Sequence, residues 1–390
     1  MAIMNTTFRQ YALLGNAFLF IFTFGAQAES PRVEVLRTPD RGIQPQAVAD
    51  ENGVVHLIYC KGEPGNGDLF YVRREAGEKS FSAPKMVNSQ RGSVVATGSI
   101  RGAQIALGRS GRIHVAWNGS GKAASKNAAG GQPMLFTRLN DASTAFEPER
   151  NVMMASNILD GGGTVAADRD GHVFVSWHAI KANGPRGEEN RQVWLARSDD
   201  DGKTFAVEVV ANDQPTGACG CCGMRAFADS KGTAYLLYRA ATNKVNRDMI
   251  LLWSNDAGKD FKSTLLHKMN TEICPMSSEA FAEGPGAVYC AWETENQVFF
   301  ASINPPGLPV KAPAIGKDCK HPALAVNRDG EILLAWAEGT GWQRGGDLAW
   351  QVFDKSGRPT SERGRIAGGI PVWGLPTAVA GKDGRFTIVH

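Results

Sequence analysis

The chain has 390 residues, of which 43% are hydrophobic and 45 are glycine. This length and apolar content suffice for one large globular domain, and the glycines suit a fold with many tight turns. The net charge of +3 is too small to indicate binding to nucleic acid or to an anionic membrane surface.

The first 28 residues have the pattern of a secretory signal peptide. Arg9 precedes an apolar run, and Ala26-Gln27-Ala28 supplies the small residues of a cleavage site. A retained membrane anchor is the alternative, but the run is short and Asn16 interrupts it. We expect export to the periplasm or the medium, no membrane attachment after cleavage, and a single domain over residues 29–390.

A short motif recurs seven times along the rest of the chain. Each copy is an apolar strand, a polar turn that ends in glycine, and a second apolar strand that usually ends in an aromatic residue. Self-similarity at this spacing is typical of repeat architectures, and a repeated hairpin indicates a β-propeller. The copies span residues 46–59, 103–117, 163–177, 224–238, 277–292, 322–336 and 376–390.

The number of blades follows from the segments between these copies. Each inner hairpin is followed by a second β-rich hairpin, which predicts blades of four antiparallel strands, A to D from the centre outward. Six repeats are complete, and the segment 33–37 has no repeat of its own. We expect an all-β propeller of seven blades, the last one closed by the N-terminal strand; six blades are the alternative. Four B strands should end in equivalent tryptophans, Trp117, Trp177, Trp292 and Trp336.

The turn after the third strand carries a second motif. Residues 198–205 read Ser-Asp-Asp-Asp-Gly-Lys-Thr-Phe, which matches S-x-D-x-G-x-T-aromatic, and residues 254–261 match with one change. This motif resembles the Asp box, or BNR repeat, of the sialidase superfamily. In such a turn the aspartate accepts backbone N–H groups, the glycine is left-handed and the aromatic ring packs between sheets. The resemblance implies a sialidase-like propeller, but the box itself does not imply an activity.

The predicted functional face is the one that carries the B–C loops and the connections between blades. Long loops on a rigid scaffold commonly hold binding residues. Arg101 and Arg225 should hold an anionic group there, with Arg247 or Arg344 as a third cation, so that Arg225→Ala should abolish binding of acidic sugars and leave stability nearly unchanged. The candidate ligand-binding residues are Gln46, Arg101, Arg225, Arg247, His321, Trp342 and Trp373, the two tryptophans stacking on sugar rings.

The sialidase resemblance also implies a catalytic set. It consists of an arginine clamp, a tyrosine nucleophile activated by a glutamate, and an aspartate as acid and base. Asp160 and Glu279 are the candidate catalytic carboxyls. The F/Y-R-I-P motif is absent, since residues 41–44 read Arg-Gly-Ile-Gln, and no tyrosine is expected at the mouth. If the protein is an enzyme, the resemblance implies a glycoside hydrolase of the exo-sialidase type with an incomplete motif.

Five of the seven cysteines lie near the starts of A strands in three successive repeats. An exported protein meets an oxidising environment, which favours a disulfide from Cys274 to one of Cys219, Cys221 and Cys222. We expect Cys221 or Cys222 within disulfide range of Cys274. A soft-metal site is the second interpretation, because Cys, Met and His suit Cu(I) and thiolates suit zinc. Buried reduced thiols are the third. The residues concerned are Cys219, Cys221, Cys222, Cys274, Cys319, Met224 and Met276, with His321 beside them.

The leading hypothesis is an exported propeller that binds or hydrolyses a glycan, in particular an acidic one, at the mouth of the channel. A periplasmic metal- or redox-binding propeller that uses the Cys/Met/His cluster is one alternative, and a non-catalytic scaffold for a partner protein is another. No cofactor is firmly implied; Cu or Zn would bind at that cluster. The expected partner is a glycan or another small anionic ligand, and not nucleic acid.

Overall fold

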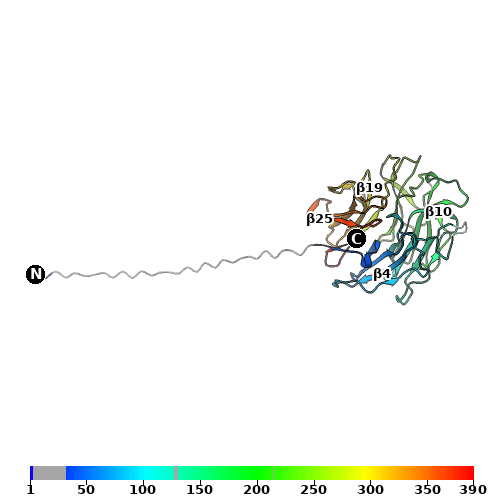
Figure 1. Cartoon of the computed structure of the whole chain (residues 1–390). Helices are drawn as coiled ribbons and strands as arrows, with labels where there is room; N and C mark the ends of the chain where they lie inside the picture. Colours follow the sequence, from blue (N-terminus) through cyan, green and yellow to red (C-terminus); the bar gives the residue numbers. More distant parts are fainter. Residues whose placement is uncertain (3–31, 127–130, 213) are drawn as a thin grey trace. The chain divides into compact units, whose positions relative to one another are not determined.

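A computed structural model describes residues 1–2, 32–126, 131–212 and 214–390. Within these ranges 27 strands form seven sheets, which are arranged around a common centre (Figure 1). The prediction of a seven-bladed all-β propeller is confirmed, and the six-bladed alternative is wrong. Of the predicted signal peptide, residues 3–28 lie outside the described ranges. Within those ranges, no helix has the length and apolar content needed to cross a bilayer.

Six blades contain four antiparallel strands that follow one another in chain order. Blade 1 holds β2 (Ile43–Ala49), β3 (Val55–Lys61), β4 (Asp68–Arg74) and β5 (Lys85–Met86). Blade 2 holds β6 (Gln104–Leu107), β7 (Ile113–Asn118), β8 (Met134–Arg138) and β9 (Arg150–Asn151). Blade 3 holds β10 (Ser156–Ala167), β11 (Val173–Lys181), β12 (Gln192–Ser198) and β13 (Val209–Val210). Blade 4 holds β14 (Met224–Ala228), β15 (Ala234–Arg239), β16 (Met249–Ser254) and β17 (Lys262–His267). Blade 5 holds β18 (Ala280–Gly284), β19 (Ala287–Thr294), β20 (Gln297–Asn304) and β21 (Val310–Lys311). Blade 6 holds β22 (Lys320–Val326), β23 (Ile332–Glu338), β24 (Gly346–Phe353) and β25 (Pro359–Ile370).

The seventh blade has three strands, β26 (Thr377–Ala380), β27 (Phe386–Val389) and β1 (Val33–Leu36). Strand β1 pairs with β27 in parallel, and backbone hydrogen bonds between Thr38 and His390 and between His390 and Leu36 extend the pairing. The predicted closure by the N-terminal strand is thus confirmed. The parallel orientation is possible because no tight turn joins β1 to its neighbour.

The A–B hairpins turn through one recurring structure. In blade 1 Asp50 accepts the backbone N–H groups of Asn52 and Val54, both at 2.8 Å, and Gly53 has a φ of 81°. Glycine ends the turn because other residues rarely adopt this left-handed conformation. Three further blades repeat the arrangement, with Asp168, Asp229 and Asn327 in the place of Asp50. An Asp/Asn-x-x-Gly sequence therefore determines these hairpins.

The segment 198–205 has the structure expected of an Asp box. Asp200 accepts the backbone N–H and the hydroxyl of Thr204, at 2.8 and 2.7 Å. Gly202 has a φ of 78°, and the ring of Phe205 packs edge-on against a phenylalanine of the preceding blade. The turn therefore stabilises the contact between blades. The assignment to the BNR family stays a prediction.

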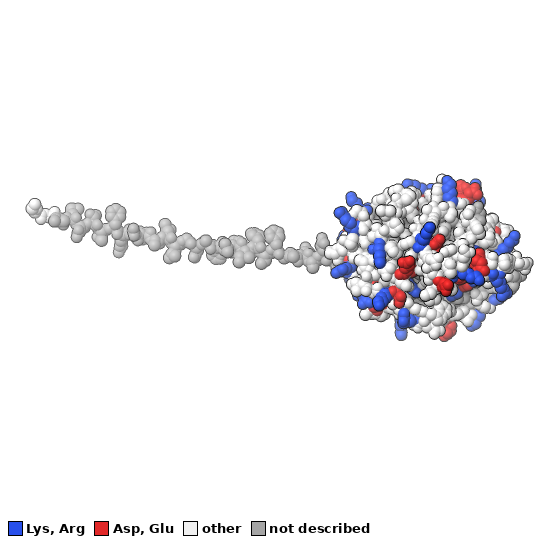
Figure 2. Space-filling model, turned by 90° about the horizontal axis from the view of Figure 1, so that it is seen from above, with Lys and Arg blue, Asp and Glu red and all other residues white. Residues whose placement is uncertain are grey.

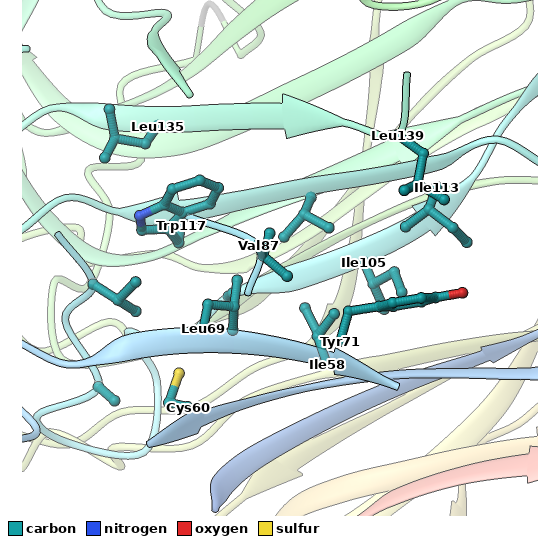
Figure 3. Close-up of a cluster of buried hydrophobic side chains, with 14 of the residues drawn as sticks. Ile58, Cys60, Leu69, Tyr71, Val87, Ile105, Ile113, Trp117, Leu135 and Leu139 are labelled. Atoms are coloured by element: carbon teal, nitrogen blue, oxygen red, sulfur yellow. The ribbon is translucent and has the colours of Figure 1, made fainter. Parts of the chain in front are cut away.

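The hydrophobic core lies between neighbouring blades. Figure 3 shows part of it, where Trp117 lies near Leu69 and Val87. The four B-strand tryptophans occupy repeat-equivalent positions, and all four are buried, as predicted. Because adjacent blades share these aromatic interfaces, the ring positions the loops at the mouth rigidly. Figure 2 shows charges of both signs interspersed over one face, without one large patch of a single sign.

Candidate functional site

A cavity of about 280 Å³ opens at the mouth of the channel, on the face that carries the B–C loops and the connections between blades. This volume lies just below the usual range of small-ligand sites. The lining comes from the starts of several blades and from the B–C loop of blade 6. Its side chains include Arg101, Met276, Lys320, His321, Trp342 and Trp373.

The A strands start with a backbone irregularity that directs side chains into this region. Gln44, Met276, His321 and Trp373 all have φ between 51° and 57°. Such values are uncommon outside glycine, and they concentrate at functional sites. In blades 1 and 6 the irregularity coincides with a shift of strand register. The regular alternation of side chains between the two faces of the sheet is therefore lost at the start of these strands, where the mouth begins.

Two tryptophans form one wall of the cavity. The rings of Trp342 and Trp373 stand edge to face, with centroids 6.0 Å apart and an interplanar angle of 63°. Trp342 is 54% exposed, unusually open for so large an apolar side chain. It lies so close to Gly98 that a Cβ there would meet the indole ring at 2.9 Å. The indoles thus present an aromatic surface to a ligand.

Two cationic groups face the same cavity. Arg101 donates from Nη2 to Asp160 at 2.8 Å and from Nη1 to the carbonyl of Thr97 at 3.2 Å. Lys320 also lines the cavity, and its charge interacts with that of Glu293 at longer range than an ion pair. Burial lowers the pKa of His321 to about 3, so this ring is neutral at neutral pH, with Nδ1 3.2 Å from the Ser278 hydroxyl. The cavity therefore has a positive local charge.

Asp160, which was predicted as a catalytic acid, forms ion pairs with two arginines. On β10 it accepts Nη2 of Arg101 at 2.8 Å and Nη2 of Arg191 at 2.7 Å. Glu188 continues the network, 3.5 Å from Arg191 and 2.6 Å from Arg247. Arg191 and Glu188 were not predicted as site residues, although they lie in a charged stretch at the end of a long B–C loop. Arg247 is paired with Glu188 and does not line the mouth cavity.

Arg225 and Arg101 line different spaces. Arg225 lies deeper in the channel, where it donates to Gln46 Oε1 at 2.7 Å and to the carbonyl of Glu279 at 3.2 Å. Burial lowers the pKa of Arg225 to about 10. Glu279 is 1% exposed, and neither carboxyl oxygen has a hydrogen-bond partner among the described residues. Burial raises the pKa of Glu279 well above its ordinary value, which favours the protonated form.

Four of the five cysteines come together beside the mouth. Cys219 and Cys222 have their sulfurs 3.5 Å apart, and Cys274 hydrogen-bonds with Cys219 and Cys221. Hydrogen bonds from Cys219 and Cys221, with the charge of nearby Arg247, lower the pKa of Cys274. All seven cysteines are free thiols in the structure. The disulfide stays a prediction.

Cys319 and Met224 lie away from the other members of the predicted cluster, which corrects the expected grouping. Cys319 is buried between blades 5 and 6, with its sulfur 3.7 Å from the carbonyl of Gly316. Met224 belongs to the core between blades 3 and 4, and Met276 lines the mouth cavity. Residues at equivalent positions of different repeats therefore do not point the same way. The backbone irregularity at the start of each A strand orients the side chains differently from blade to blade.

The tyrosines near the channel are structural. Tyr235 donates to Asp229 at 3.1 Å, and Tyr238 contacts the hydroxyl of Thr216 at 2.7 Å. Both are buried, and burial raises the pKa of each. Among the described residues, no tyrosine and no carboxylate lines the mouth cavity. The geometry of a sialidase nucleophile is not present there.

Comparison with known proteins supports the fold. No family model and no curated protein matches the chain, but 340 chains of solved structures do. The Hadza microbial sialidase Hz136 is 14% identical over 84% of this chain and 74% of its own, with a TM-score of 0.50. Trypanosoma rangeli sialidase in complex with the inhibitor DANA is 10% identical over 79% of this chain and 54% of its own, with a TM-score of 0.53. Penicillium chrysogenum alpha-L-arabinanase complexed with arabinobiose is 13% identical over 82% of this chain and 95% of its own, with a TM-score of 0.54.

Identities this low show the fold alone. The chain is a seven-bladed β-propeller, and its fold is similar to that of these sialidases and of the arabinanase.

Proposed function

We propose that this protein is exported and binds an acidic sugar in the mouth cavity. The observation that carries the proposal is the pairing of two indole rings with two cationic groups in one cavity, Trp342 and Trp373 with Arg101 and Lys320. The C–H face of a sugar ring packs on an aromatic surface, and a few placed polar groups fix its orientation. A uronic or sialic acid supplies both the ring and the carboxylate.

The charges of the cavity favour an anion. Lys320 forms no close ion pair with a described residue, and its charge interaction with Glu293 acts at longer range. Arg101 uses only part of its five N–H donors on Asp160 and Thr97. A guanidinium retains its charge at all relevant pH values, and its planar fork suits a carboxylate. One acidic group on the ligand would therefore satisfy donors that the protein leaves available.

The same geometry favours binding over hydrolysis. A retaining glycosidase needs two carboxyls, or a substitute nucleophile, on either side of the scissile bond. Here Asp160 is held by two arginines, and Glu279 is buried in a separate part of the channel. Two proteins with this fold are named as a sialidase and as an arabinanase with arabinobiose bound, which makes sugars the first ligand class to test.

Calorimetric titration of the purified full chain tests the proposal. We expect glucuronic acid or N-acetylneuraminic acid to bind, and glucose to bind more weakly because it lacks the carboxylate. Trp342→Ala should reduce affinity for the acid at least about tenfold, a loss of about 1.4 kcal/mol. The matched control is Trp253→Ala, since Trp253 lies on β16 away from the mouth. Absence of binding to both acids, or equal affinity in the Trp342 variant, would refute the proposal.

A further inference from the structure

The thiol cluster beside the mouth takes no part in the proposed sugar contacts. At its centre one carboxylate oxygen of Glu188 and the sulfurs of Cys219 and Cys274 lie within 4.8 Å of one another. Two more sulfurs flank this centre. Cys222 lies 3.5 Å from Cys219, and Cys221 hydrogen-bonds with Cys274. Four thiols and a carboxylate therefore gather in one small volume.

We propose that this cluster binds one thiophilic d10 metal ion, Zn(II) or Cu(I), with Cys219 and Cys274 as its central ligands. Glu188 or a flanking thiol completes the coordination. Both ions prefer thiolates, and zinc also accepts a carboxylate oxygen. The two ions share one property, a closed d shell, and the same thiolate ligands would bind either of them.

The spacing of the sulfurs supports a shared ion. Two thiolates on one tetrahedral zinc, at about 2.3 Å from the metal, lie about 3.8 Å apart. The separation of 3.5 Å between Cys219 and Cys222 is close to this value. The two residues also have the C-x-x-C spacing of many metal sites, and a turn with the N–H of Cys222 3.3 Å from the carbonyl of Cys219 brings their side chains together.

The loop that carries these thiols is fixed by the protein itself. The N–H of Cys219 donates to the carbonyl of Arg239 at 2.9 Å, and the N–H of Gly223 donates to the carbonyl of Ser277 at 2.8 Å. The N–H of Gly220 donates to Glu188 at 3.3 Å. Ligands held in this way lose little conformational freedom when an ion binds.

The surrounding charge suits an anionic complex. Four guanidinium groups are paired with three carboxylates around the cluster, so one positive charge remains. Three thiolates on Zn(II), or two on Cu(I), carry a net charge of minus one and offset it. The groups are Arg101, Arg191, Arg239 and Arg247 with Asp160, Glu188 and Glu293.

The site adjoins the sugar cavity but does not depend on it. Cys221 lines the mouth cavity, whereas Cys219 and Cys222 are fully buried. A bound ion would therefore sit behind the cavity wall. Metal binding can be measured without any sugar, so the two proposals can fail independently.

The test is metal titration of the reduced, metal-free full chain. Zn(II) and Cu(I) are each titrated against a competing chelator, and bound metal is measured by mass spectrometry. We expect one ion per chain, and the tighter of the two identifies the ion. Co(II) should also give a thiolate charge-transfer band, which reports sulfur ligation directly.

The variants are Cys219→Ser and Cys274→Ser, with Cys319→Ala as the control because that buried thiol lies outside the cluster. Loss of a central ligand should weaken binding by more than about 100-fold, beyond the usual effect of changing an outer-shell partner. The control should bind as the wild type does.

The wild-type Co(II) spectrum keeps the test valid if a serine variant does not fold. Less than about 0.1 equivalent of both ions bound by the reduced wild type would overturn the proposal, as would a Cys219–Cys274 disulfide in freshly purified protein.

Discussion

Arg225 and Gln46 are joined by a hydrogen bond of 2.7 Å although 179 residues separate them in the chain. Arg225 lies on the innermost strand of blade 4 and Gln46 on that of blade 1. The bond therefore connects distant blades inside the channel, below the mouth cavity. This placement suggests a structural role for Arg225, which differs from the anion-binding role expected from the sequence.

Replacing Arg225 by alanine should lower the free energy of unfolding by about 2 kcal/mol, because hydrogen bonds of a charged group contribute about 1.5–3 kcal/mol. Urea denaturation measures the change. Gln46→Ala should cost less when Arg225 is already absent, since the pair acts as a unit. Arg344→Ala is the control, because among the described residues that exposed side chain has one hydrogen bond, to the carbonyl of nearby Gly339. An unchanged midpoint in the Arg225 variant, together with lost sugar binding, would restore the anion-binding interpretation.

Glu279 should make the fold less stable as pH rises. Burial raises its pKa, so the folded protein keeps the proton after the unfolded chain has released it near pH 4.3. Above that pH the unfolded state binds fewer protons, and stability falls with increasing pH. Glu279→Gln should reduce this decline between pH 5 and 8 in urea unfolding experiments. Glu283→Gln, on the same strand but partly exposed, should keep it. Parallel pH profiles of wild type and Glu279→Gln would contradict the assignment.

His178 should have the opposite effect in acid. It is fully buried, and burial together with the charge of Arg191 lowers its pKa to about 3. Between about pH 6.5 and 3 the unfolded chain is protonated at this site and the folded chain is not, so stability falls with decreasing pH by up to about 1.4 kcal/mol per unit. His178→Gln should have a shallower slope between pH 6.5 and 4. His172→Gln, at a partly exposed histidine paired with Asp168, is the control. An equal slope in both variants would show that His178 is not responsible.

The fold can be predicted from the sequence because each repeat contains the residues that determine its own turns and strands. The Asp50 turn and the Asp200 box depend on residues a few positions apart, and the B-strand tryptophans recur at one register of the hairpin. Local hydrogen bonds and period-2 alternation are readable without tertiary information. The closing strand was found by elimination, since the segment 33–37 had no other partner. Its parallel pairing depends on how the chain ends meet, which no local pattern encodes.

The site was predicted only in part. Trp342, Trp373 and Arg101 were expected at the mouth, and the structure places them there. Cys319 was wrongly grouped with the other cysteines because the left-handed residue His321 and the register shift break the alternation. Lys320 was overlooked for the same reason. Side-chain direction at such irregular positions is set by packing between blades, and no single repeat reveals it.

Lys320 should determine the preference for acidic sugars. Its side chain lines the cavity beside the tryptophans and forms no close ion pair with a described residue, although its charge interacts with that of Glu293 at longer range. If the proposed sugar binding is correct, Lys320→Met should weaken affinity for glucuronic acid about five- to tenfold, or about 1–1.4 kcal/mol, because it removes one partly exposed charge interaction. Affinity for glucose should change little.

The wild type should lose affinity for the acid as salt increases, and the variant should be less sensitive because one screened charge pair is gone. Calorimetric titrations at low and high ionic strength measure both effects, and Lys355→Met, at an exposed lysine outside the cavity, is the control. Equal loss of affinity for both sugars would instead assign Lys320 to the shape of the cavity.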